Sequence, residues 1–404
     1  MATSVSFDRK ALNFRILSIV IFTFVTYLSI GLPLAVLPGF THNNLGYSAA
    51  IAGVVISIQY FATLISRPQA GRYSDLFGPK KVVIGGLLCS ALSGFCYWMA
   101  DLVSVTPGLC LTLICIGRFI LGFGESFGST GSTLWGIGAT GSEHTGLVIS
   151  WNGVATYGAM ALGAPFGVLI TDHYGLSSLG ITIFVCGVIS ALYALTKTPV
   201  KVQSGPRLSF SKVFSKVWLH GLGLALGTIG FGVIATFITL FYAQQHWQGA
   251  ATALSLFSLA FVGIRLLFNS YIAKYGALKA AIVSFAFEIV GLLLVWLAIS
   301  PMMTHLGVFI TGGGFSLIFP ALGVEAVKRV PVQNQGTALG TYSAFLDCGL
   351  GLTGPAAGLI IHHYSMNTIY LVAAVCVFFA VLLTLRLQAY TAIEAHRAEE
   401  QTQS

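Results

Sequence analysis

The charged residues of this chain are separated by unusually long gaps. No charged residue lies between Arg15 and Arg67, between Lys216 and Arg265, or between Asp347 and Arg386. A helix needs about 20 residues to cross roughly 30 Å of hydrocarbon, so each stretch is longer than one crossing. Only 8% of the 404 residues are charged, against about 25% in a typical soluble protein. The sequence therefore predicts an all-α membrane protein.

The apolar runs break at charges, glycines and prolines into twelve predicted transmembrane helices. These cover residues 14–38, 49–67, 82–100, 108–136, 147–171, 178–196, 217–243, 250–273, 279–299, 303–326, 336–361 and 368–388. If the first span leaves the cytoplasm, almost every Lys and Arg falls on the cytoplasmic side, as the positive-inside rule requires. We therefore predict a membrane protein with both termini in the cytoplasm.

The chain divides into two related groups of six spans. The predicted parts are an N-terminal six-helix bundle (1–196), a cytoplasmic linker (197–216), a C-terminal six-helix bundle (217–390) and a cytoplasmic tail (391–404). A shift of 190 residues places Gly146 on Gly336 and His173-Tyr174 on His363-Tyr364. A shift of 198 places Arg67, Gly78 and Lys81 on Arg265, Gly276 and Lys279. Two pseudo-symmetric bundles in the same orientation are typical of transporters with a substrate site at mid-membrane.

A glycine and acid motif lies between the second and third spans. Its residues are Gly71, Asp75, Gly78, Lys80 and Lys81. Their spacing resembles motif A of the major facilitator superfamily, although Leu76 and Pro79 stand where that family usually has a base. We expect Asp75 to cap the next helix and to pair with a base from the opposite half. These five residues are predicted to form a cytoplasmic gate.

The fourth span carries two charges inside a predicted membrane helix. Arg118, Gly122 and Glu125 share one helix face and resemble motif B of the same family. A lone Arg in hydrocarbon costs several kcal/mol, so the two charges are expected to face a wet cavity or each other. Arg118 is predicted to bind substrate; a buried structural ion pair is the alternative.

The fifth and eleventh spans end in glycine-rich segments with a proline. Pro165 lies in the first segment and Pro355 in the second, and both segments partly resemble motif C of proton antiporters. Small residues let helices approach closely and proline bends a helix. Both prolines are predicted to belong to the gating machinery, although helix packing explains these segments nearly as well.

Acidic residues at membrane depth are candidates for proton coupling. Asp347 is the one charged residue of the eleventh span, and burial disfavours the charged form of a carboxyl. Glu125 is the competing candidate, but Arg118 on the same face favours its charged form. Glu288, in the ninth span, is left open between a structural and a functional role.

Polar and aromatic residues within the spans are predicted to line the substrate cavity. Besides Arg118 they are Tyr27, Gln59, Tyr60, Asn152, Tyr157, Thr239 and Tyr242. No cluster of cysteines or histidines has metal-ligand spacing, so no metal site or cofactor is expected. No catalytic set or phosphate-binding loop is evident either, which argues against an enzyme or an ATP-driven pump.

Over its whole length the chain is similar to bacterial MFS-type transporters of the YfcJ/YhhS group. Segments such as 31–38, 59–63, 131–136 and 319–324 carry this resemblance. It implies a protein of the bacterial inner membrane that moves a small solute. The repeat, the glycine and acid motif and the buried charges Arg118, Glu125 and Asp347 favour a monomeric secondary active transporter that works by alternating access and is coupled to protons, with efflux by antiport as one possible direction. The alternatives are a facilitative or importing carrier, or a non-transporting membrane sensor. Beyond the solute, protons and the lipid bilayer, no nucleic acid or other partner is expected.

Overall fold

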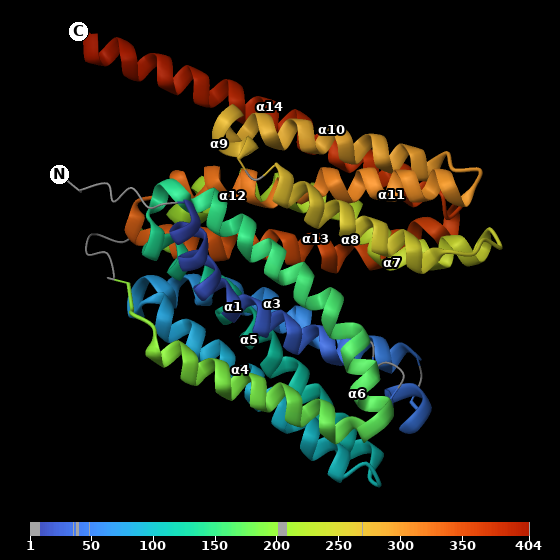
Figure 1. The fold of residues 1–404 in the computed structure, drawn as a ribbon. Coiled ribbons are helices and arrows are strands. Elements are labelled where there is room, and N and C mark those ends of the chain that lie inside the picture. Colours follow the sequence, from blue (N-terminus) through green and yellow to red (C-terminus); the bar gives the residue numbers. More distant parts are fainter. Residues whose placement is uncertain are drawn as a thin grey trace. The chain divides into compact units, whose positions relative to one another are not determined.

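The computed structural model describes residues 9–34, 36–37, 40–47, 49–200, 208–268 and 270–403, and every regular element within them is a helix (Figure 1). The helices in chain order are α1 (Arg9–Leu34), η1 (Phe40–Asn44), α3 (Ala49–Phe77), α4 (Pro79–Leu102), α5 (Pro107–Thr140), η2 (Ser142–His144), α6 (Thr145–Thr196), α7 (Phe210–Gln244), α8 (Ala250–Leu267), α9 (Tyr271–Tyr275), α10 (Ala277–Trp296), α11 (Pro301–Ser316), α12 (Ile318–Lys328), η3 (Val332–Asn334), α13 (Gln335–His363) and α14 (Thr368–Gln403). The prediction of an all-α chain is confirmed.

Each predicted span coincides with helical structure. Nine of the helices in the described ranges are long and apolar enough to cross a membrane. The fifth and sixth spans form the single element α6, which changes direction at Gly175, where φ is +78°. The tenth span is interrupted at Leu317, between α11 and α12. The described part of the first helix runs to Leu34, and residues 35 and 38–39, at the predicted end of the first span, lie outside the described residues.

The repeat detected in the sequence is visible in the backbone. Gly78 separates α3 from α4 with φ of +89°, and Gly276 separates α9 from α10 with φ of +90°. These two glycines are 198 residues apart, the shift that relates the two halves of the sequence. An L-residue with a side chain rarely adopts this conformation, so glycine is required at both turns.

The chain forms two compact units. Unit 1 contains residues 1–213 and 330–344, and unit 2 contains residues 214–329 and 345–404. The start of α13 therefore belongs to unit 1, together with the N-terminal helices. The helix α7 begins at Phe210, inside the predicted linker, and α14 continues to Gln403 through the predicted tail.

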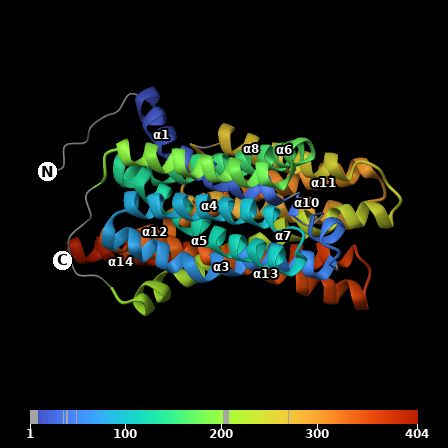
Figure 2. The same cartoon turned by 90° about the horizontal axis from the view of Figure 1, so that it is seen from below.

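Close helix packing within unit 1 depends on small residues. A Cβ atom at Gly163 would lie 2.9 Å from the main chain of Gly31, and one at Gly167 would lie 1.9 Å from the Leu32 carbonyl oxygen. These glycines therefore let α1 and α6 touch backbone to backbone. The helices α4 and α5 run side by side in both views (Figures 1 and 2), with Gly86 against Gly128.

The outer faces of several helices carry large apolar side chains. Leu88 and Leu92 on α4 and Ile189 and Leu192 on α6 are exposed. A row of exposed aliphatic side chains on long apolar helices is expected where lipid replaces water as the solvent. The molecule is therefore a multi-pass membrane protein.

Candidate transport site and gate

A buried ion pair joins two helices of unit 1. The guanidinium Nη2 of Arg67, on α3, lies 3.0 Å from Oε1 of Glu125, on α5, and both side chains are buried. In the sequence Arg67 stood out only as the end of an uncharged stretch and as a repeat position, so this pair was missed. One signal could have revealed it: Arg265 stands at the repeat position of Arg67. An arginine at the same position in both halves indicates that the side chain has a structural role in each half.

Glu125 also accepts hydrogen bonds from three neutral side chains. Its Oε2 accepts one from Gln59 Nε2 and one from Thr63 Oγ1, each at 3.0 Å, and its Oε1 accepts one from the Tyr27 hydroxyl at 3.3 Å. Donors from α1 and α3 thus surround a carboxylate on α5. Two of the predicted cavity residues, Tyr27 and Gln59, are brought together here with a predicted proton-coupling acid.

Arg118 lies on the same face of α5 as Glu125, but the groups that contact the two side chains are different. Its Nη2 donates to the Ile56 carbonyl oxygen at 3.2 Å, whereas Nε and Nη1 have no hydrogen-bond partner among the described residues. The side chain is fully buried. Two unsatisfied guanidinium donors inside a protein are costly, so Arg118 is available to a ligand or to water.

Gly122 permits the close contact of α3 and α5 between these two charges. A Cβ atom there would lie 2.5 Å from the Gln59 carbonyl oxygen and 2.9 Å from the Thr63 amide nitrogen. One turn further on, Ser126 Oγ donates to the Thr63 carbonyl oxygen at 3.0 Å. The register between the two helices is therefore set by main-chain contacts, and this register determines which α3 side chains reach Glu125.

Unit 2 repeats these main-chain contacts with different side chains. Gly312 packs on the Phe257 carbonyl, and Ser316 Oγ donates to the Phe261 carbonyl oxygen at 2.6 Å. Phe257, Phe261 and Phe315 stand at the repeat positions of Gln59, Thr63 and Glu125. Phe231 stacks on Phe257 and Phe315, with ring centroids 5.3 and 5.2 Å away. The polar cluster of unit 1 is thus replaced by an aromatic cluster in unit 2.

Arg265 has found a main-chain acceptor in place of a carboxylate. Its Nη2 donates to the carbonyl oxygen of Ser316, where α11 ends, and its guanidinium carbon lies 4.6 Å from the centre of the Phe261 ring. The interruption at Leu317 frees helix carbonyls that would otherwise accept bonds from the next turn. A main-chain carbonyl at the helix break therefore accepts a hydrogen bond from Arg265 in unit 2, where Glu125 accepts one from Arg67 in unit 1.

The remaining predicted cavity residues are distributed over both units. Asn152 on α6 accepts a hydrogen bond from Thr23 Oγ1 on α1, and Tyr60 and Tyr157 are half-buried. Tyr242, in unit 2, is buried against Trp247 and His305 and donates to the Pro301 carbonyl oxygen at 3.3 Å.

Asp347, on α13 in unit 2, is buried at 6% exposure. The side chains of Thr239, Pro165 and Pro355 lie outside the part of the chain that the structure describes.

Asp75 caps the first turn of α13. Its Oδ1 accepts a hydrogen bond from the Gly336 amide at 2.9 Å, and its Oδ2 accepts from the amide and the hydroxyl of Thr337, both at 2.8 Å. The expectation that Asp75 caps the next helix is wrong: α4 begins after Gly78, with no side-chain cap. The first amides of any helix lack intrahelical acceptors, and a carboxylate there also meets the positive end of the helix dipole.

Glycines bring the two helices of this cap into main-chain contact. A Cβ atom at Gly71 would lie 2.0 Å from the Gly336 carbonyl oxygen, and one at Gly340 would lie 2.5 Å from the Arg67 carbonyl oxygen. The α3 segment from Arg67 to Asp75 is therefore the surface on which the first turns of α13 rest. The same segment carries the Glu125 ion pair at one end and the Asp75 cap at the other.

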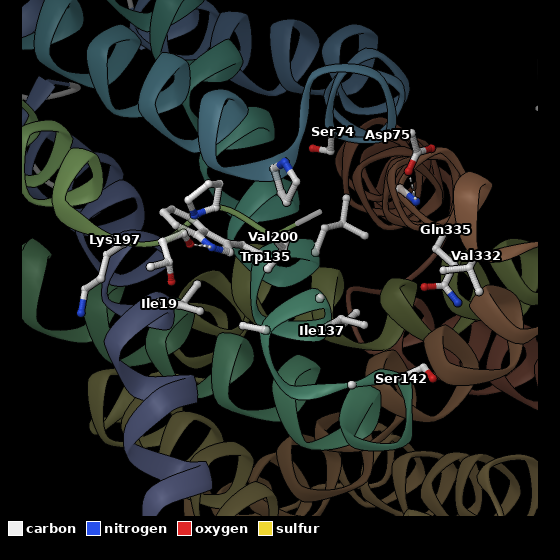
Figure 3. A pocket seen from close by; sticks show the side chains of 18 of the residues that line it. Ile19, Ser74, Asp75, Trp135, Ile137, Ser142, Lys197, Val200, Val332 and Gln335 are labelled. Atoms are coloured by element: carbon white, nitrogen blue, oxygen red, sulfur yellow. Dashed lines mark hydrogen bonds between the residues drawn. The ribbon is translucent and has the colours of Figure 1, made fainter. Parts of the chain in front are cut away.

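A cavity of about 610 Å³ opens beside the cap. Asp75 and Gln335 line it at one side, and Trp135, Lys197 and Val200 line it at the other (Figure 3). Trp135 Nε1 donates to the Thr198 carbonyl oxygen at 3.1 Å. The residues that follow α6 are thus held against the end of α5 and form one wall of the cavity.

The two predicted gate lysines have different surroundings. Lys80 Nζ donates to the carbonyl oxygens of Leu195, at 2.8 Å, and Lys197, at 2.6 Å. It therefore caps the C-terminal end of α6, where a cation is favoured by the helix dipole. Lys81 is exposed.

Long apolar helices around a buried, hydrogen-bonded ion pair define a polytopic membrane protein with a polar centre inside its N-terminal helices. The family model described as Major Facilitator Superfamily matches residues 19–340 and 223–404. A relative from Escherichia coli O6:H1, named as the uncharacterized MFS-type transporter YhhS, is 55% identical over 387 residues, 96% of each chain. Its counterpart from Escherichia coli K12 is 56% identical over 377 residues, 93% of each chain. The chain belongs to the Major Facilitator Superfamily, whose members are transporters and not enzymes.

Solved structures share the fold. The transporter FucP in its outward conformation matches with a TM-score of 0.76 at 17% identity, over 91% of this chain and 97% of its own. A bacterial homologue of the iron transporter ferroportin, in an outward-facing state, matches with a TM-score of 0.78 at 12% identity, over 93% of this chain and 99% of its own. At these identities the likeness concerns the fold alone.

Proposed function

We propose that this carrier is a proton-coupled secondary transporter of a small polar solute, working by alternating access. The observation that carries the proposal is the Arg67–Glu125 pair with its ring of neutral donors. Ionisable groups inside a membrane are costly, and they usually mark a substrate or proton pathway. Packing alone does not require them here, because unit 2 builds the same helix contacts around phenylalanines.

In the proposed mechanism Asp347 carries the coupling proton, and Glu125 is the competing candidate. Glu125 accepts a charge-assisted bond from Arg67, an arrangement that suits it to substrate binding. A substrate donor can replace Tyr27, Gln59 or Thr63 on its oxygens. Arg118, with two unsatisfied donors, is a second anchor for an acceptor on the substrate.

The proposed gate is the contact between α3 and the first turn of α13. Asp75 holds that turn through three hydrogen bonds, so it must release it whenever the two helices separate. Gly71 shapes the contact, Gly78 shapes the turn after it, and Lys80 and Lys81 follow that turn. Pro165 and Pro355 are proposed bending points in α6 and α13. We place the chain in the inner membrane as a monomer, with this gate and both termini on the cytoplasmic side.

Solved structures with this fold include a fucose:proton symporter and a proton:xylose symporter. Their sequence identities of 15% and 13% to this chain carry no information on its solute. The two symporters do support proton coupling as a mechanism that this fold can accommodate. Efflux by antiport and import by symport are equally compatible with the buried acids, so direction is a result that the experiment must supply.

The test is transport by the purified protein in proteoliposomes, with and without a pH gradient, against a panel of sugars, drugs and amino-acid-like solutes. Asp347→Asn is expected to abolish accumulation driven by the gradient while preserving solute exchange. Among the steps of transport, Glu125→Gln is expected to affect mainly solute binding. Full gradient-driven transport by Asp347→Asn would refute its assignment. Binding of a solute without any exchange would indicate a sensor.

A further inference from the structure

Glu288, on α10, is an acid in unit 2 that the proposed mechanism does not use. It is fully buried, and neither of its carboxyl oxygens has a hydrogen-bond partner among the described residues. Buried polar groups are normally satisfied, and an ionised carboxyl without a partner is among the most costly groups a protein can bury. A bound proton removes the charge, so the surroundings of Glu288 select its neutral form.

The carboxyl lies in a notch between two neighbouring helices. A Cβ atom at Gly230, on α7, would lie 2.2 Å from Oε1, so the carboxyl occupies the space that a side chain on α7 would need. On α11, a Cβ atom at Gly314 would lie 2.5 Å from the amide nitrogen of Glu288. The closeness of α7, α10 and α11 therefore keeps water from the carboxyl.

The corresponding place in unit 1 shows that the fold does not need an acid there. Ser90 stands at the repeat position of Glu288, and Gly124 packs against it as Gly314 packs against Glu288. Matching Tyr27 to Phe231 by their contacts places Thr26 opposite Gly230. Both hydroxyls in unit 1 donate to their own helix, Ser90 to the Gly86 carbonyl oxygen and Thr26 to the Phe22 carbonyl oxygen. In unit 2, α7 has Gly230 at this position, and the carboxyl of Glu288 fills the space that a side chain would take.

Within the described residues, no ion pair or hydrogen bond joins Glu288 to a titratable group on the helices around it. Those groups are Lys212, Lys216, His220 and Tyr242 on α7, Tyr271, Lys274 and Tyr275 on α9, Lys279 on α10 itself, His305 on α11, Glu325 and Lys328 on α12, and Tyr370, Cys376, Arg386 and Tyr390 on α14. His220 and Tyr242 are ten and twelve residues from Gly230, which is about 15 to 18 Å along a helix. His305 is nine residues from Gly314, or about 14 Å.

We propose that Glu288 is a proton-binding site of unit 2, which holds a proton while α7 closes the notch at Gly230 and exchanges it with water when α7 moves away. The site is additional to Asp347 and Glu125. It rests on the proposed function only in assuming that α7 moves during transport. The ligand is the proton itself, and the part that moves is the backbone of α7 at Gly230.

Infrared spectroscopy of the protein in lipid tests the site without any substrate. A protonated carboxyl has a carbonyl band distinct from that of a carboxylate, and the band shifts when the proton exchanges for deuterium. At neutral pH, Glu288→Gln is expected to remove one such band. Glu325→Gln is the matched control, because Glu325 pairs with Lys328 at 3.1 Å, and it should remove none. An unchanged protonated-carboxyl region in Glu288→Gln would show an ionised Glu288 and overturn the proposal.

A second variant tests the exchange. In Gly230→Ala the new methyl group meets the end of a flexible side chain and not the backbone, so the carboxyl can swing away while the helices stay packed. The Glu288 band should then exchange with deuterium at least several times faster than in the wild type. A band that never exchanges in either protein would make Glu288 a permanently neutral packing residue and refute its role as a proton site. Because neither readout requires transport, a failure here is distinguishable from a failure of proton coupling.

Discussion

The cap of Asp75 on α13 can be tested by Asp75→Asn. Asparagine keeps one acceptor oxygen, but it has no charge and presents an NH₂ group to the other donor. Hydrogen bonds to charged groups contribute about 1.5–3 kcal/mol each, and the helix dipole adds about 0.3–1 kcal/mol. The asparagine oxygen can keep the two Thr337 bonds in neutral form while the bond from Gly336 is lost, so we expect the contact to lose about 2–4 kcal/mol. Each 1.4 kcal/mol is tenfold, so local opening should become roughly 30- to 700-fold more frequent.

Hydrogen exchange of the amides of Gly336 and Thr337 measures this opening directly. Both amides lie in the first turn of α13 and donate to Asp75, so their protection should fall by that factor. Asp101→Asn is the matched control, since Asp101 caps Ser177 in the same unit, at 2.9 Å from its amide. It should expose Ser177 and leave α13 unchanged. A change below about threefold in Asp75→Asn, or an equal change in the control, would refute the reasoning.

Three further predictions concern packing and topology. Glu125→Gln leaves Arg67 buried without its counter-charge and should destabilise the protein by about 3–5 kcal/mol. The double variant Arg67→Met/Glu125→Met should recover much of that loss in thermal unfolding; no recovery would count against a coupled pair. Gly71→Ala places a methyl group 2.0 Å from a main-chain oxygen and should deprotect Gly336 in hydrogen exchange, whereas Gly85→Ala, 3.9 Å from the nearest side chain, should not. Reporter fusions at residues 245 and 404 should lie on opposite sides of the membrane; the same side for both would contradict the topology.

Much of the fold was predictable from one sequence because its signals are local. The long stretches without charge predicted the membrane helices, and the 198-residue repeat matched Gly78 with Gly276, each of which forms a turn between helices in the structure. Both turns have the same positive φ in the structure. The boundaries were less accurate where a helix continues past a charge, as α14 does.

Which side chains meet was decided by the tertiary structure. Arg67 and Glu125 are 58 residues apart, and Asp75 and Gly336 are 261 residues apart. The sequence supplied both acids, but it placed Arg118 and Glu125 on one helix face, toward a wet cavity or each other, and led us to expect a cap by Asp75 on the next helix. The actual partners follow from the register in which α3 packs on α5 and on α13. That register is set by glycine contacts with main-chain atoms of a distant helix, and periodicity within one helix carries no information about it.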